Sequence, residues 1–144
     1  SDVCSSDLVS SFLRAESFLM ERNPRSWNLD EIEIIETATL DSFVRDNSIY
    51  PNILKIDTQG FDLEVLKGAM EVLERNVIQI VQVECMFARN YENQPYFWDI
   101  AIFMSNLGYH FHSFTRLVET GRGNLYFGDA TFISANAWEK LGMR

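Results

Sequence analysis

The sequence predicts an α/β fold whose sheet is mostly parallel. Short β-branched segments alternate with segments of helical period, in the order strand, strand, helix, strand, helix, strand, strand. Residues 77–84 are rich in Val and Ile with few charges, as expected for a strand buried on both faces of a parallel sheet. The last two predicted strands, at residues 109–114 and 125–133, have no long crossover between them, so we expect them to be antiparallel neighbours.

The first third of the chain carries the weakest signals. Residues 9–20 show a faint helical pattern that ends at the break around Pro24. Residues 31–40 alternate polar and apolar side chains, which indicates a half-buried strand. A short helix is expected to begin within residues 40–44, with Asp41 as its N-cap.

The middle of the chain has clearer periodicity. Residues 53–56 predict a short strand, and residues 62–74 predict a helix whose apolar side chains recur at intervals of three, four and three. Pro95 opens the next helix, and Gly108 supplies its C′ position. After the final strand pair, the tail at residues 138–141 favours a helical turn.

Composition and charge favour one acidic domain in a reduced, cytoplasmic setting. The 144 residues are 47% hydrophobic with a formal charge of −9, which argues against nucleic acid and anionic membrane surfaces as partners. No apolar run approaches the ~20 residues of a membrane span, and two cysteines, Cys4 and Cys85, do not make a disulfide framework. Residues 1–8 are compositionally odd and resemble a translated adapter, so we do not interpret them as native sequence.

Two acidic residues stand at the ends of predicted strands. Asp57 follows the first of the two central strands, and Glu84 closes the second. Ligands of open α/β sheets bind outside the carboxyl ends of the strands, so adjacent strands would bring Asp57 and Glu84 into one crevice. Gln59 and Asp62 lie just beyond Asp57, where Gly60 permits a sharp bend or a close approach to a ligand.

Each of these acids also has a structural interpretation. Asp57 can accept backbone N–H groups of its own turn, Asp62 can interact with the helix dipole for ~0.3–1 kcal/mol, and Glu84 can be a solvated charge. The three carboxylates could also bind a divalent cation, but nothing in their spacing enforces it, so we assign no metal site. His110 and His112 lie two apart on one face of a predicted strand, and without a third ligand we interpret them as a polar face.

The run from Leu54 to Ala69, Leu-Lys-Ile-Asp-Thr-Gln-Gly-Phe-Asp-Leu-Glu-Val-Leu-Lys-Gly-Ala, closely resembles the signature of the FkbM-type S-adenosylmethionine-dependent methyltransferases. Flanking segments agree in order. They are Thr-Leu-Asp at residues 39–41, Val-Gln-Val-Glu at 81–84, Tyr-Glu-Asn-Gln-Pro at 91–95, and Gly-Asp-Ala-Thr-Phe-Ile at 128–133, which is similar to the family's final strand. The resemblance therefore covers residues 37 to 135.

The resemblance implies the C-terminal part of a Rossmann-like methyltransferase sheet, mostly parallel with an antiparallel final strand pair. Residues 1–30 would then be a poorly defined N-terminal segment, and residues 31–144 a partial domain. No Asp-x-Gly-x-x-x-Gly run precedes Asp57. We therefore expect the cofactor-binding half to be missing and the fragment to be inactive by itself.

The resemblance also implies the chemistry. The expected reaction methylates a hydroxyl group of a small-molecule acceptor, such as a sugar, a lipid or a secondary metabolite, with S-adenosylmethionine as cofactor. Asp57 would contact the cofactor and act in catalysis together with Glu84. Gln59, Gly60 and Asp62 would form the loop that faces cofactor or substrate. Many family members have Glu where this chain has Gln59. The Gln59 side chain can still form hydrogen bonds, but it lacks the negative charge of Glu.

Two other classes of function are also consistent with the sequence. A metal-dependent phosphodiesterase also uses a Lys-Ile-Asp strand end, but its Glu-Ala-Leu motif is absent from this sequence. A non-catalytic interaction module that retains only the α/β half-fold is the third alternative. Neither the acceptor nor the oligomeric state follows from the sequence.

Overall fold

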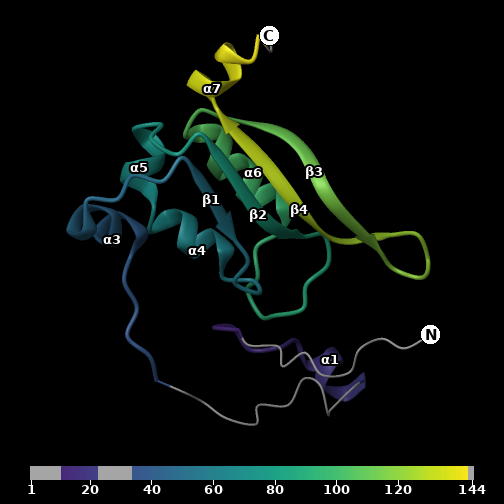
Figure 1. Cartoon of the computed structure of the whole chain (residues 1–144). Helices are drawn as coiled ribbons and strands as arrows, with labels where there is room; N and C mark the ends of the chain where they lie inside the picture. The colour runs from purple at the N-terminus through teal and green to yellow at the C-terminus, as the bar shows by residue number, and fades with distance from the viewer. Residues whose placement is uncertain (1–10, 23–33, 143–144) are drawn as a thin grey trace.

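The structure is a four-stranded sheet with helices packed against it (Figure 1). The computed structural model describes residues 11–22 and 34–142. The strands are β1 (Ile53–Ile56), β2 (Ile80–Met86), β3 (Tyr109–Glu119) and β4 (Leu125–Ser134), in the spatial order β1-β2-β4-β3. The helices are α1 (Ser17–Arg22), α3 (Leu40–Asn47), α4 (Asp62–Lys67), α5 (Met70–Glu74), α6 (Phe97–Asn106) and α7 (Ala135–Lys140).

The prediction of a mostly parallel sheet is wrong, although the fold is α/β. β1 and β2 pair in parallel, whereas β4 pairs antiparallel with both β2 and β3. The expected antiparallel final pair is present, but its hairpin folds β4 back into the position between β2 and β3. The segment that contains α6 connects β2 to β3, and these two strands are not neighbours because β4 lies between them. β2 therefore pairs with the antiparallel strand β4 on that side.

The strand predicted at residues 31–40 is absent from the part that the structure describes. Residues 34–39 have no regular structure, and Ile34 is 98% exposed. Alternating side chains stabilise a strand only where a neighbour pairs with its backbone, and the described sheet ends at β1. Several predictions lie outside the described residues, namely those at residues 1–8, Pro24 and 31–33.

Asp41 does not cap its own helix. α3 begins after Thr39, whose hydroxyl accepts a hydrogen bond from the Ser42 backbone N–H at 3.2 Å. The Asp41 carboxylate instead accepts hydrogen bonds from the backbone N–H groups of Glu71 and Val72, at 3.0 and 3.1 Å. Asp41 therefore caps the first turn of α5, which lies far along the chain.

This contact divides the helix predicted at residues 62–74 into α4 and α5. In a continuous helix the Val72 N–H would donate to the carbonyl of Gly68, four residues earlier. Here the Gly68 carbonyl accepts from the Asp41 backbone N–H at 2.9 Å, and Val72 donates to the Asp41 side chain. Met70, the third of the four apolar residues whose spacing predicted that helix, falls at the break and is 39% exposed.

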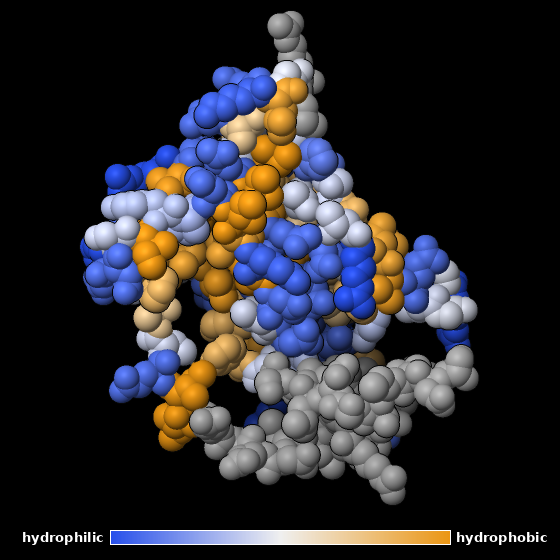
Figure 2. Space-filling view, viewed as in Figure 1, coloured by the Kyte–Doolittle hydropathy of each residue, from blue (hydrophilic) through white to orange (hydrophobic). Residues whose placement is uncertain are grey.

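One face of the sheet packs against α4, α5 and α6, and the opposite face carries polar side chains at its centre. Val81 and Val83 of β2 are fully buried in the core that these helices complete. On the opposite face Gln82 donates to the Thr115 hydroxyl at 2.8 Å. Figure 2 shows hydrophilic side chains over the middle of the face turned to the viewer, with hydrophobic ones beside them. The central strand is therefore half-buried, and the prediction that both of its faces are buried is wrong.

Residues 11–16 form an arm that crosses the loops following β1 and β2 (Figure 1). Ala15 makes an antiparallel bridge with Tyr91, flanked by two backbone hydrogen bonds of 2.7 and 2.8 Å. Within the described part of residues 9–20, the predicted helix is limited to the start of α1. The arm brings the beginning of the chain against the carboxyl ends of the parallel strands.

Candidate functional site

The carboxyl ends of β1 and β2 bring Asp57 and Glu84 to the same edge of the sheet. The parallel register pairs Ile56 with Val83, so the residues that follow them occupy corresponding positions. Glu84 does not end its strand as expected, since β2 continues to Met86. Asp57 is exposed, whereas Glu84 is half-buried.

The Gln59 amide joins the two carboxylates. Its Nε2 donates to Asp57 Oδ1 at 3.2 Å and to Glu84 Oε2 at 3.3 Å. The Gln59 backbone is left-handed, with φ 52°, and its carbonyl accepts a hydrogen bond from the Ser11 hydroxyl at 2.7 Å. The arm thus holds this turn from outside, while the side-chain amide separates two like charges.

Asp62 and Gly60 shape the same turn from inside. Asp62 is 3% exposed, and its two oxygens accept from the backbone N–H groups of Thr58 and Gly60, both at 3.0 Å. Burial raises the pKa of Asp62, and these hydrogen bonds oppose that increase. Gly60 has φ 98°, and a Cβ there would lie 3.0 Å from Gln94 Nε2 and 3.1 Å from Tyr91 Cδ2. Glycine therefore permits both the backbone conformation and the close contact with the next loop.

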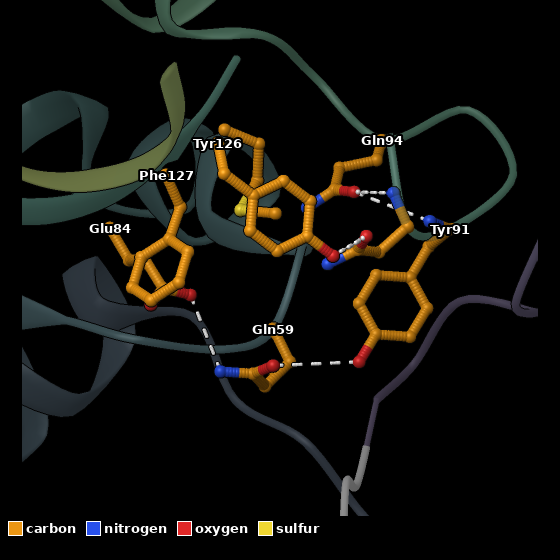
Figure 3. A pocket seen from close by; sticks show the side chains of 8 residues that line it. Gln59, Glu84, Tyr91, Gln94, Tyr126 and Phe127 are labelled. Atoms are coloured by element: carbon orange, nitrogen blue, oxygen red, sulfur yellow. Dashed lines mark hydrogen bonds between the residues drawn. The ribbon is translucent and has the colours of Figure 1, made fainter. Parts of the chain in front are cut away.

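A pocket of about 120 Å³ opens beside Glu84 and Gln59 (Figure 3). The Tyr91 hydroxyl donates to Gln59 Oε1 at 3.5 Å, and the Tyr126 hydroxyl donates to Asn90 Oδ1. Aromatic walls with a few convergent polar groups are typical of small-molecule sites. The remaining lining residues are Met86, Gln94 and Phe127.

Sequence reasoning did not identify most of these walls. They come from β4 and from the loop between β2 and α6, neither of which has a period that marks an inward side chain. The sequence signal for this wall was the run Tyr-Glu-Asn-Gln-Pro at residues 91–95, one of the segments that carry the family resemblance, and its Gln94 side chain is only 1% exposed.

Glu84 has a pKa suited to proton exchange near neutrality. Burial is the largest cause that raises its pKa, from 4.5 to about 7. The nearby carboxylates of Asp57, Asp62 and Asp129 raise this pKa further. The Arg116 guanidinium lowers it. A carboxyl in a cleft with both burial and charged neighbours is a candidate for acid–base chemistry.

The described residues contain no group of three His, Cys, Asp or Glu side chains placed to hold a metal ion. His110 stacks on Trp138 with ring centroids 4.8 Å apart, and His112 meets the edge of the same ring at 6.3 Å. His112 Nδ1 also lies 2.8 Å from Ser113 Oγ. Both histidines thus contribute to an aromatic cluster on β3 and α7.

Acidic side chains at adjacent carboxyl ends of a parallel strand pair, beside an aromatic pocket, are typical of an α/β enzyme. The sequence matches the methyltransferase FkbM domain over residues 6–111, and the chain belongs to that family. The resemblance seen at residues 54–69 is therefore confirmed. No curated protein and no solved structure gives a significant match. Among the described helices, none is long and apolar enough to cross a membrane.

Proposed function

We propose that this chain carries the acceptor side of an S-adenosylmethionine-dependent methyltransferase, which methylates a hydroxyl group of a small molecule. Family membership supplies the reaction class. The observation that supports the site most strongly is the half-buried Glu84 carboxyl, with its pKa of about 7, beside a pocket of about 120 Å³. In this proposal residues 31–144 belong to the acceptor-side part of the domain.

Glu84 is the proposed general base. A base is most effective when its pKa lies near the operating pH, and that of Glu84 is about 7. An acceptor hydroxyl in the pocket would donate its proton to a Glu84 carboxylate oxygen as the hydroxyl oxygen becomes nucleophilic. Asp57, linked to Glu84 through the Gln59 amide, would orient that carboxylate and face the donor.

S-adenosylmethionine fits these residues only in part. The carboxylates of Asp57 and Glu84 complement its positively charged sulfonium. The pocket is smaller than the ~300–1,000 Å³ typical of sites that enclose a ligand, so these residues would hold the methyl-bearing end alone. When bound, the donor supplies an electrophilic methyl group. Gln59 and Gly60 would line the loop near that end, with Asp62 supporting the loop from behind.

The test is methyl transfer from isotopically labelled S-adenosylmethionine to a panel of hydroxylated small molecules, with protein that carries this sequence in its natural length. We expect Glu84→Gln to lower kcat by about 10²–10⁴, because the general base is lost. Asp57→Ala should weaken donor binding in calorimetry, and Glu139→Gln on the exposed side of α7 is the control. Wild-type transfer by Glu84→Gln would refute the base, and metal-dependent activity without donor binding would refute the reaction class.

A further inference from the structure

Gln94 is a buried polar side chain to which the proposed reaction gives no role. Its side chain is 1% exposed and lies in the loop between β2 and α6. The Gln94 Oε1 accepts hydrogen bonds from two successive backbone N–H groups, those of Asn90 at 2.9 Å and Tyr91 at 3.3 Å. An amide oxygen has two lone pairs, so one side chain satisfies both donors and closes the loop.

The closed loop presents a hydroxyl to Gln59 (Figure 3). Tyr91 is 3% exposed, and its hydroxyl donates to Gln59 Oε1 at 3.5 Å. Burial, followed by the charge of Glu84, raises the pKa of Tyr91 to about 12, so this hydroxyl keeps its proton. A donor at Oε1 sets the orientation of the Gln59 amide, whose NH₂ end then faces Asp57 and Glu84.

Packing connects the two loops at a second point. The Gly60 backbone lies so close to Gln94 that a Cβ would stand 3.0 Å from its Nε2. Gln94 thus contacts the turn that carries Gln59 and also holds Tyr91 against it. Within the part of the chain that the structure describes, Gln94 makes no hydrogen bond to the carboxylate of Asp57 or Glu84.

We propose that Gln94 is a positioning residue of this site. By holding the backbone at Asn90 and Tyr91, Gln94 orients the Tyr91 hydroxyl and, through it, the Gln59 amide that bridges Asp57 and Glu84. The inference rests on the proposed function only in taking Glu84 as the reactive group. The chain of contacts itself can be measured without donor or acceptor.

The test follows the Gln59 side-chain amide by NMR of the full chain across the neutral pH range. In the wild type its resonances should shift as Glu84 ionises near pH 7. The other charged groups around Glu84 are Asp57, Asp62, Asp129 and Arg116, and the variants leave all four in place. Gln94→Met should remove at least half of the Gln59 shift. Gln94→Glu keeps an oxygen acceptor for both N–H groups and should restore the shift, with a midpoint raised by the added carboxylate.

A second variant separates positioning from mere loop stability. Tyr91→Phe should reduce the Gln59 shift as Gln94→Met does, but leave slow hydrogen exchange at the backbone amides of residues 90 and 91 unchanged. Gln79→Met, at an exposed position before β2, should change neither. If Gln94→Met does not fold, Tyr91→Phe decides the question.

An unchanged Gln59 shift in Tyr91→Phe would overturn the proposal, as would a Gln94→Met variant that loses only amide protection at residues 90 and 91. Since neither S-adenosylmethionine nor an acceptor is present, these outcomes are independent of whether the protein transfers methyl groups. A protein without transferase activity could still show the Gln59 response, and an active one could lack it.

Discussion

Glu84→Gln should stabilise the folded chain above neutral pH. Folding raises the pKa of this carboxyl from 4.5 to about 7, so the folded state binds the proton more tightly than the unfolded state. The resulting stability is fully present below pH 4.5 and is lost as the pH rises through about 7. The Gln variant has no proton to lose, and its stability should lack this decline.

The magnitude follows from the same shift. A change from 4.5 to about 7 corresponds to at most about 3.4 kcal/mol, at ~1.4 kcal/mol per pH unit. Glu84 is only half-buried, so water screens part of this energy and we expect a gain of about 1–2 kcal/mol. A Gln at this position can still accept from Gln59, so no donor is left without its partner.

The assay is urea unfolding on either side of neutrality, with the free energy of unfolding obtained by linear extrapolation. Glu139→Gln, an exposed substitution on α7, controls for the change in net charge. The difference between Glu84→Gln and wild type should grow as the pH rises and vanish in acid. An equal difference at all pH values, or a variant less stable in alkali, would refute the reasoning.

Three further substitutions test the turn, a buried tyrosine and the helix break. Gly60→Ala should cost about 1–3 kcal/mol, because the left-handed residue gains a Cβ that crowds the next loop. Gly123→Ala also has positive φ but no atom within 4 Å of its added Cβ, and an equal loss there would contradict crowding. Tyr109→Phe should cost about 1–3 kcal/mol, since the Ile78 carbonyl loses its hydroxyl donor, and an unchanged Tm in calorimetry would count against this. Asp41→Ala should cost about 0.5–2 kcal/mol by uncapping α5, which urea unfolding followed by circular dichroism would detect.

Local chemistry was sufficient to predict the central strands and the boundaries of α6. β-branched runs marked β1 and β2, while Pro95 and Gly108 marked the two ends of the helix. The place of β4 between β2 and β3 could not be predicted in this way. The choice of the strand that pairs with β2 depends on packing between segments distant in the sequence. The periodicity of a single segment does not encode that packing.

The same division applies to the candidate site. Asp57 and Glu84 could be brought together from the sequence, because parallel neighbouring strands place their ends at one edge. The position of Tyr91 could not, since it depends on hydrogen bonds from an irregular loop to Gln94. Asp41 was assigned to the nearest helix because capping preferences are local, whereas its carboxylate caps a helix thirty residues away.

The contact between Asp41 and α5 also has a topological consequence. The carboxylate and the Glu71 N–H close a loop of thirty residues that contains all of β1 and the turn carrying Gln59. The entropy cost of closing such a loop grows only slowly with its length, so a single hydrogen bond between residues distant in the sequence can restrict a long segment. α5 has five residues, far fewer than the ~12–15 that an isolated helix needs to persist in water. Its formation therefore depends on the docking of α3, and the two events together confine the segment that bears the acidic edge of the sheet.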